Sequence, residues 1–199
     1  MCGICGILNL AGGPVDGVLL NRMTRIIRHR GPDGEGRWLD REVGLGHRRL
    51  SIIDVDGGGQ PIGNEDDRLQ IVFNGEIYNF IELRKELEQH GHRFRTRSDT
   101  EVIVHAYEQW GADCVRRFNG MFAFALWDAR ERTLFLARDH LGIKPLYYTR
   151  VGDELLFASE IKSLLEHPGV ERAVDLEALA ELFTFRFVPS PKTLFRGIL

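Results

Sequence analysis

The chain begins Met1-Cys2-Gly3-Ile4-Cys5-Gly6-Ile7, a short apolar strand pattern with a cysteine at its second position. If Met1 is removed, Cys2 carries both a thiol and a free α-amine. A thiolate is a strong nucleophile, and an α-amine with a pKa of about 8 is partly free base at neutral pH. One residue would then supply both a nucleophile and a base, as in enzymes with an N-terminal threonine.

Cys2 and Cys5 also form a C-x-x-C pattern, which leaves other interpretations open. A structural zinc site needs two more ligands, but the third cysteine, Cys114, is distant and the seven histidines show no paired spacing. A thioredoxin-like pair belongs at a strand-to-helix turn rather than in an opening strand. The remaining interpretation is that both cysteines are small buried apolar residues, which we expect for Cys5.

Composition excludes several classes of protein. The 199 residues suffice for one large domain, and the net charge of −3 argues against a nucleic-acid partner. The sequence contains neither an apolar run of about 18 residues nor a secretory signal pattern, so no membrane association is expected. An odd number of cysteines, three, favours the cytoplasm.

Hydrophobic periodicity predicts an α+β fold with two antiparallel sheets and separate helices. The predicted strands cover residues 4–10, 36–39, 43–51, 69–73, 120–127, 133–138, 145–149 and 154–158. The predicted helices cover residues 18–27, 80–89, 102–110, 160–165 and 175–185, and the third of them follows a capping-box pattern of Ser98 and Glu101. Four of these helices follow a residue suited to cap the first turn, namely Asn79, Ser98, Ser159 and Asp175. Residues 193–199 read as the first strand of an unfinished hairpin, so we expect the natural protein to continue.

Several sequence blocks occur together in a characteristic order: residues 1–6, RHRGPD at 28–33, GHRRLSIID at 46–54, QP at 60–61, NGEIYN at 74–79, SDTE at 98–101, NGMFAFALWD at 119–128, RDHLGIKPLY at 138–147 and ASEIK at 158–162. Through these blocks the chain resembles the glutaminase domain of class II glutamine amidotransferases, which are N-terminal-nucleophile hydrolases. The NGEIYN and RDHLGIKPLY blocks favour the asparagine synthetase branch of that group.

The resemblance implies a four-layer αββα sandwich of two mostly antiparallel sheets. It implies that residues 1–170 form a glutaminase domain, and that residues 171–199 begin a linker toward a C-terminal synthetase domain. Glutamine would be hydrolysed to glutamate and ammonia through a thioester on Cys2. The ammonia would serve ATP-dependent conversion of aspartate to asparagine in the full-length enzyme. ATP and Mg²⁺ are expected for that second domain, whose Ser-Gly-Gly-x-Asp-Ser loop does not occur here; no cofactor or metal is expected in this chain. A homodimer is compatible with the sequence.

The resemblance also assigns roles to individual residues. The Asn74 side chain and the Gly75 N–H match the oxyanion-hole pair, although Asn-Gly on its own predicts a tight turn. Arg49 matches a clamp for the substrate carboxylate, whereas the sequence alone cannot choose between Arg48 and Arg49. Backbone groups of the following residues would line the same pocket, namely Leu50, Ser51, Ile52 and Ile53.

Two acidic residues, Glu76 and Asp99, match the groups that receive the substrate ammonium. Without the resemblance, Asp99 would be a favourable charge at a helix N-terminus and Glu76 an ordinary exposed carboxylate. His29 and Asp33 are expected to order a loop rather than to form a catalytic pair. The Gly57–Gly59 loop lacks the lysine of a phosphate-binding loop.

Two other functions stay open from the sequence. The acceptor of the ammonia would be determined by the C-terminal domain, which lies outside this sequence. An acceptor in cell-surface or exopolysaccharide chemistry therefore stays open. The chain could also be a non-catalytic domain that retains the fold.

Overall fold

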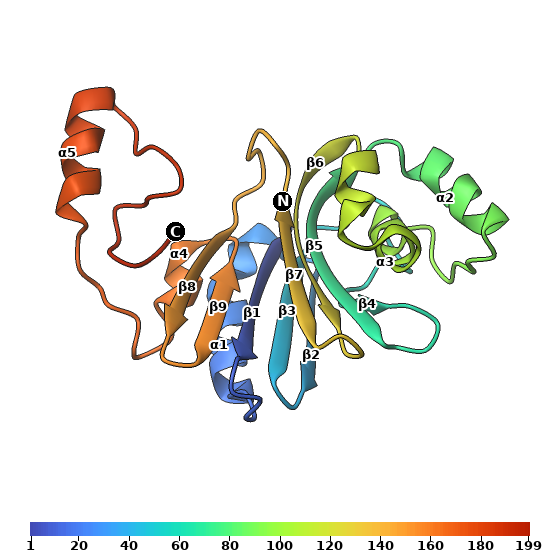
Figure 1. Ribbon diagram of the computed structural model, residues 1–199, viewed down its shortest axis with the longest axis horizontal. Coiled ribbons are helices and arrows are strands. Elements are labelled where there is room, and N and C mark those ends of the chain that lie inside the picture. The colour runs from blue at the N-terminus through green and yellow to red at the C-terminus, as the bar shows by residue number, and fades with distance from the viewer.

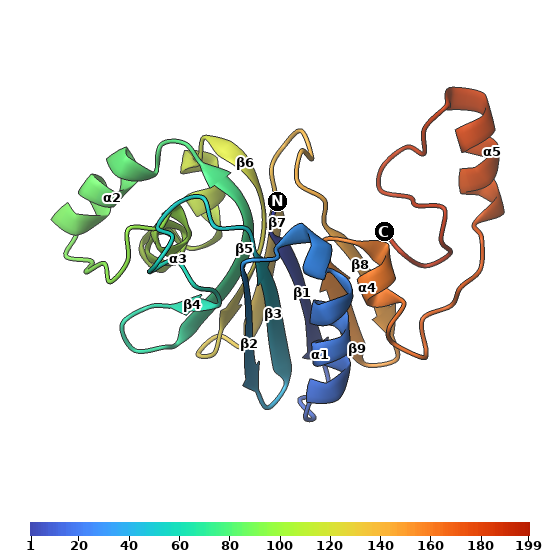
Figure 2. The ribbon, with the colours of Figure 1, turned by 180° about the vertical axis from the view of Figure 1, so that it is seen from behind.

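The computed structural model describes all 199 residues and contains two antiparallel sheets packed face to face (Figure 1). The first sheet has the order β2-β3-β1-β9-β8 and the second has the order β4-β5-β6-β7. Helices α1 and α4 cover the outer face of the first sheet, as Figure 2 shows from behind, and α2 and α3 cover the second. The predicted four-layer αββα sandwich is confirmed.

The strands of the first sheet are β1 (Gly3–Asn9), β2 (Gly34–Asp40), β3 (Val43–Arg49), β8 (Tyr147–Val151) and β9 (Glu154–Ala158). Those of the second are β4 (Ile62–Gly63), β5 (Leu69–Ile77), β6 (Gly120–Asp128) and β7 (Thr133–Arg138). The α-helices are α1 (Gly17–Ile26), α2 (Phe80–Gln89), α3 (Asp99–Trp110), α4 (Ile161–Leu164) and α5 (Leu176–Phe185), with short 3₁₀ helices at Arg28–Arg30 and Gly111–Arg117. None of the helices is long and apolar enough to cross a membrane.

Alternation along the strands builds three apolar layers. On β1, Ile4 packs between the two sheets while Cys5 and Ile7 face α1. On β5, Val72 packs between the sheets while Phe73 faces the layer of α2 and α3. Because successive side chains of a strand point to opposite faces, the position of one buried residue fixes the face of every second residue along the same strand.

Two of the four predicted helix caps form as expected. The carboxylate of Asp175 accepts from Ala178 N–H at 3.0 Å at the start of α5. Ser98 Oγ accepts from Thr100 N–H at 3.1 Å at the start of α3. The carboxylate of Glu101 does not return to complete a capping box, because it accepts N–H groups of the preceding loop at Arg95 and Thr96.

The other two predicted caps are wrong, because tertiary partners take the side chains. The Asn79 side chain donates to Arg117 C=O at 2.9 Å, at the end of the 3₁₀ helix that follows α3. It also accepts from Asn119 N–H at 2.9 Å, just before β6. Ser159 Oγ accepts from Ile4 N–H at 3.0 Å, which ties the end of β9 to the start of β1. Helix α4 therefore begins after Glu160, without a side-chain cap.

The C-terminal segment departs from the sandwich. Helix α5 stands away from both sheets (Figure 1), and residues 193–199 do not form the predicted strand. They make one isolated bridge, between Phe195 and Val174, and reciprocal hydrogen bonds between Leu199 and Tyr148 on the edge strand β8. β8 itself begins two residues later than predicted, at Tyr147.

A buried histidine links the two sheets. His47 of β3 is fully buried, and its Nε2 lies 3.2 Å from the carbonyl oxygen of Phe73 on β5. Burial lowers the pKa of His47 to about 3, with the Arg49 charge acting in the same direction and the Phe73 hydrogen bond opposing it. The imidazole is therefore neutral at neutral pH, and Nε2 is the donor to the carbonyl.

This neutral histidine makes the stability of the protein depend on pH. Between about pH 6.5 and pH 3 the unfolded chain binds a proton at His47 that the folded chain does not, so stability falls on acidification. We expect a slope of about 1.4 kcal/mol per pH unit in this range from His47. In urea titrations between about pH 6.5 and 5, the His47→Gln variant should lack this slope, and the exposed control His90→Gln should keep it. Equal pH dependence in the parent and His47→Gln would contradict the assignment.

Candidate active site

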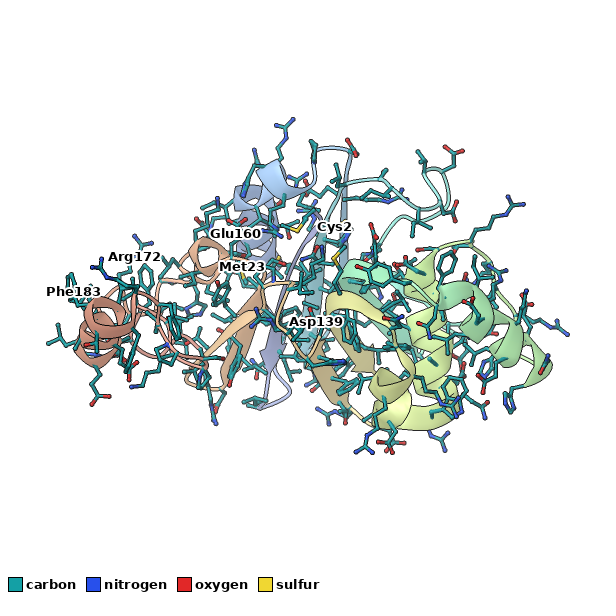
Figure 3. All side chains as sticks on the ribbon, turned by 90° about the horizontal axis from the view of Figure 1, so that it is seen from above. Cys2, Met23, Asp139, Glu160, Arg172 and Phe183 are labelled. Atoms are coloured by element: carbon teal, nitrogen blue, oxygen red, sulfur yellow. The ribbon has the colours of Figure 1, made fainter.

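The two sheets enclose a cavity of about 220 Å³ at the end where β1 begins and β5 nears its end. Cys2 lies two residues before Ile4, and Asn74 two residues after Val72, so strand alternation turns both toward the space between the sheets. Both residues line the cavity. Figure 3 shows Cys2 near the centre of the molecule and Phe183 of α5 at its far edge.

The Cys2 thiol is half-buried against the backbone of Leu50. Its Sγ lies 3.4 Å from Leu50 N, which donates to it, and 3.6 Å from Leu50 O. Burial raises the pKa of the Cys2 thiol above 9.0, while the Leu50 N–H, the positive N-terminus and Arg49 act in the opposite direction. The thiol is therefore protonated at neutral pH in this chain, and a reaction at Sγ needs a base close by.

The nitrogen of Cys2 is an amide here, because Met1 is attached. Met1 lines the cavity, and its Sδ lies 3.4 Å from Lys144 Nζ. Cys2 itself is held independently of Met1, since Arg30 Nε donates to its carbonyl oxygen at 2.9 Å and Arg30 Nη1 pairs with Glu160 at 3.0 Å (Glu160 is labelled in Figure 3). Removal of Met1 would open part of the cavity and free an amine beside the thiol.

Two hydrogen-bond donors of β5 belong to residues in the wall of the cavity. Asn74 is 1% exposed, and its Nδ2 makes no hydrogen bond. Along β5 the N–H groups alternate between the two edges of the strand. Those of Phe73 and Ile77 point away from β6, toward the side chains of Gln60 and Asp99, so the Gly75 N–H points to that same edge.

The sequence interpretation of Asn74-Gly75 as a turn is wrong. The two residues lie inside β5, opposite Ala123 and Phe122 of β6, and the strand continues to Ile77. Glycine is required there by close approach, since a Cβ on Gly75 would lie 2.3 Å from the carbonyl oxygen of Met121. The strand thus holds the donors rigidly, and no turn is needed to expose them.

A buried carboxylate forms another wall of the cavity. Asp99 is 4% exposed and forms no ion pair, although its Oδ2 accepts from Ile77 N–H at 3.0 Å. Burial raises the pKa of Asp99, and hydrogen bonds from Ile77, Ser98 and Thr100 oppose that effect. A buried, unpaired carboxylate facing a cavity favours a cationic ligand. Glu76 lines the same cavity from the end of β5.

Arg49 lines the cavity and also organises its rim. Nη1 donates to Val55 C=O at 2.8 Å, and Nη2 donates to Ile53 and Asp54 carbonyls at 3.2 and 2.5 Å. Because a guanidinium has five N–H donors, Nε and one N–H of Nη1 are left for a ligand. The structure therefore adds to the predicted clamp a role in shaping the loop after β3.

The loop after β3 contributes most of the predicted lining residues. Leu50, Ile52 and Ile53 line the cavity, whereas Ser51 faces a neighbouring recess, where its N–H donates to Asp33 Oδ2 at 2.9 Å. His29 contacts Glu160 with its Nε2 at 2.8 Å and does not line the cavity.

Sequence reasoning assigned no site role to several residues of the cavity wall, among them Gln60 and Lys144. Gln60 accepts from Phe73 N–H at 2.7 Å and donates to Thr100 Oγ1 at 3.1 Å, so it joins β5 to α3. Lys144 is 5% exposed and enters from the β7–β8 connection. Asp139 shapes that connection by accepting from the N–H groups of Ile143 and Lys144 (Asp139 is labelled in Figure 3). Gln60 and Lys144 lie in the sequence blocks that carry the family resemblance, and this was the only signal in the sequence that could have pointed to them.

Comparisons with known proteins agree with this geometry. The glutamine amidotransferase domain family matches residues 1–199. A Bacillus subtilis protein named asparagine synthetase [glutamine-hydrolyzing] 1 is 48% identical over 197 residues, which cover 98% of this chain and 31% of that protein. An Arabidopsis thaliana asparagine synthetase [glutamine-hydrolyzing] 3 is 44% identical over 82% of this chain and 28% of its own length. The chain thus spans about a third of the length of these relatives.

Among solved structures, the glutamine phosphoribosylpyrophosphate amidotransferase of B. subtilis is similar, with a TM-score of 0.67 and 23% identity over 82% of this chain and 43% of that one. A second, described as the allosteric regulatory enzyme of purine biosynthesis, gives a TM-score of 0.70 over 83% of this chain and 43% of that one. These likenesses show the fold of the N-terminal-nucleophile amidotransferases. Together with the match over its whole length, they establish that the chain belongs to the glutamine amidotransferase domain family and is similar to the glutamine-hydrolysing asparagine synthetases.

Proposed function

We propose that this chain, once Met1 is removed, hydrolyses the side-chain amide of glutamine to glutamate and ammonia. The observation that carries the proposal is the unpartnered Nδ2 of Asn74, buried beside the outward N–H of Gly75 in the cavity that contains the Cys2 thiol. A buried donor without a partner costs free energy, so such a donor on a residue of the cavity wall fits a ligand oxygen. Their place in the cavity supports roles as donors to an oxyanion.

The chemistry divides into two steps at Cys2. The α-amine takes the thiol proton, Sγ attacks the γ-carbonyl carbon, and the oxyanion of the tetrahedral intermediate accepts from Asn74 Nδ2 and Gly75 N–H. When the C–N bond breaks, the amine gives its proton to the departing ammonia and a thioester remains. Water, deprotonated by the same amine, then attacks the thioester to release glutamate. Burial disfavours the charged thiolate, so transfer of the thiol proton to the amine forms the nucleophile.

The α-ammonium and α-carboxylate groups of glutamine share one carbon, and charged residues that line the cavity would bind both of them. Asp99, buried and unpaired, suits the α-ammonium group, with Glu76 beside it. A free N–H of Arg49, on Nε or Nη1, suits the α-carboxylate, because a hydrogen bond between two charged groups is a strong one. The backbone of Leu50, Ile52 and Ile53 would close the remaining side, and Ser51 would support that loop through Asp33.

The relatives suggest what becomes of the ammonia. We propose that residues 1–170 form the glutaminase unit, that residues 171–199 begin a linker, and that a synthetase domain using ATP and Mg²⁺ to convert aspartate to asparagine completes the protein. The relatives' names favour this acceptor over cell-surface chemistry. Exposed apolar side chains on and after α5 suit a further packed domain, namely Leu176, Phe183, Phe185 and Phe187. Three free cysteines fit the cytoplasm.

The nucleophile assignment is tested by substitution in a preparation that intact-mass spectrometry shows to lack Met1. We expect Cys2→Ala to lower glutamine hydrolysis by at least about 10³-fold, because no other thiol lines the cavity. Cys114→Ala is the matched control and should keep the parent rate, since Cys114 is buried away from the cavity. Equal rates in Cys2→Ala and the parent, or a parent without activity in the full-length protein, would contradict the proposal.

The oxyanion role predicts a change in kcat rather than in KM. Asn74→Ala should lower kcat by about 10²–10³-fold, because the lost donor acts on charge that develops in the transition state. KM should change by less than about tenfold. Iodoacetamide labelling of Cys2, which needs no oxyanion donor, serves as the control for an intact cavity and should proceed at the parent rate. A kcat within about threefold of the parent would exclude Asn74 as a donor.

For the residue that binds the substrate ammonium group, we expect a change in KM rather than in kcat. Asp99→Asn keeps an oxygen to accept from Ile77 N–H but removes the charge, so KM for glutamine should rise by about 10²-fold or more. Hydrolysis of a glutamine analogue that lacks the α-amine should be equal in the parent and the variant. If both substrates are affected alike, Asp99 acts on the fold of the cavity and does not bind the ammonium.

A further inference from the structure

A cluster of imidazoles and carboxylates lies outside the cavity, on the layer formed by α2 and α3. It joins three segments: Glu65 in the β4–β5 turn, His92 in the α2–α3 connection, and His105 and Glu108 on α3. The potential ligand atoms of Glu65, His92 and His105 all lie within 4.8 Å of one another. The histidines have no paired spacing in the sequence, so only the fold brings them together.

The cluster lacks internal hydrogen bonds although His105, which contacts both glutamates, is buried. His105 is 1% exposed, and neither of its ring nitrogens has a hydrogen-bond partner. Glu108 Oε2 is likewise buried and unpartnered. Closest approaches within the cluster are 3.5–3.8 Å, which is too long for hydrogen bonds. Leaving such groups unsatisfied is costly, so the arrangement fits a group bound between them.

Three of the four side chains have one atom engaged in a hydrogen bond on the outer side of the cluster. Glu65 Oε1 accepts from Arg93 N–H at 3.2 Å, and His92 Nε2 contacts Gln109 Oε1 at 3.1 Å. Glu108 Oε1 accepts from Asn64 Nδ2 at 3.3 Å and faces Arg68 Nη2 at 3.4 Å.

His105 differs, because its Nε2 faces Glu101 Oε1 at 3.7 Å without a hydrogen bond. A proton on Nε2 of either histidine leaves the Nδ1 lone pair directed inward. A carboxylate or amide behind the imidazole is the usual support of a metal-binding histidine.

Three of the separations between inner atoms are close to those of a tetrahedral ion site. His105 Nδ1 lies 3.6 Å from Glu108 Oε2 and 3.8 Å from Glu65 Oε2, and His92 Nδ1 lies 3.5 Å from Glu108 Oε2. Two ligands at about 2.0–2.1 Å from Zn²⁺ in tetrahedral geometry are roughly 3.3–3.4 Å apart. A small inward movement of the side chains would therefore complete the site. Two carboxylates and two neutral imidazoles would also balance the charge of a divalent cation.

We propose that Glu65, His92, His105 and Glu108 bind one divalent transition-metal ion of the Zn²⁺ class. Four protein ligands leave no open position, so the site is structural rather than catalytic. The ion would fix the β4–β5 turn and the α2–α3 connection to α3. Because Asp99 begins the same helix, the site would also steady one wall of the cavity without taking part in its chemistry.

The test uses the untagged chain in a Cys2→Ala background, because an N-terminal thiol beside an amine would itself bind zinc. After chelation and dialysis, calorimetric titration with ZnCl₂ should give one ion per chain. At a free Zn²⁺ concentration of 100 times Kd, Tm should rise by roughly 5–10 °C. MgCl₂ should have no effect on Tm, since imidazole ligands disfavour Mg²⁺.

Substitutions then locate the ion. His92→Gln and Glu65→Gln, at the more accessible positions, should weaken Zn²⁺ binding by about 100-fold or more, and Gln109→Ala by about tenfold. His90→Gln, an exposed histidine at the end of α2, is the matched control and should bind like the parent. Folding of each variant is checked by its Tm without metal.

Two results would overturn the proposal. One is the absence of stoichiometric Zn²⁺ binding and of a Tm shift in the parent, which would make the cluster an ion-pair network only. The other is His92→Gln and Glu65→Gln variants that fold and bind Zn²⁺ as tightly as the parent.

Discussion

The pairing of β5 with β6 through Asn74 and Gly75 is the constraint on which the cavity depends. Antiparallel pairing uses one edge of β5, so the Gly75 N–H points to the other edge, and strand alternation turns the Asn74 amide between the sheets. The same alternation on β1 brings Cys2 to that layer. Strand register sets the positions of the two donors, and hydrogen bonds from Arg30 and Leu50 hold Cys2 just before β1.

Sequence reasoning could predict the parts of the fold that depend on local pattern. Apolar alternation located most strands, and Ser98 and Asp175 cap helices as local chemistry requires. It failed where distant segments compete for a polar side chain, as at Asn79 and Ser159. Asn-Gly was misread as a turn because its local preference gives way to pairing with β6. The site residues came from the resemblance, and the structure brings all of them except Ser51 to one cavity.

Some residues could not have been found from the sequence. Gln60 and Lys144 reach the cavity through loops whose paths depend on contacts far along the chain. The cluster around His105 draws on three separated segments. In both cases the residues come together only in the folded chain. The useful observation is then which of their buried polar atoms lack hydrogen-bond partners.

The central claim is that glutamine acylates the Cys2 thiol in a cavity prepared for the oxyanion. Rapid mixing of the chain lacking Met1 with glutamine, followed by acid quench and intact-mass and peptide mass spectrometry, tests it most directly. The account predicts a transient γ-glutamyl adduct on Cys2, absent from Cys2→Ala. Steady-state hydrolysis with no adduct at any quench time, or an adduct on Cys5 or Cys114, would contradict it.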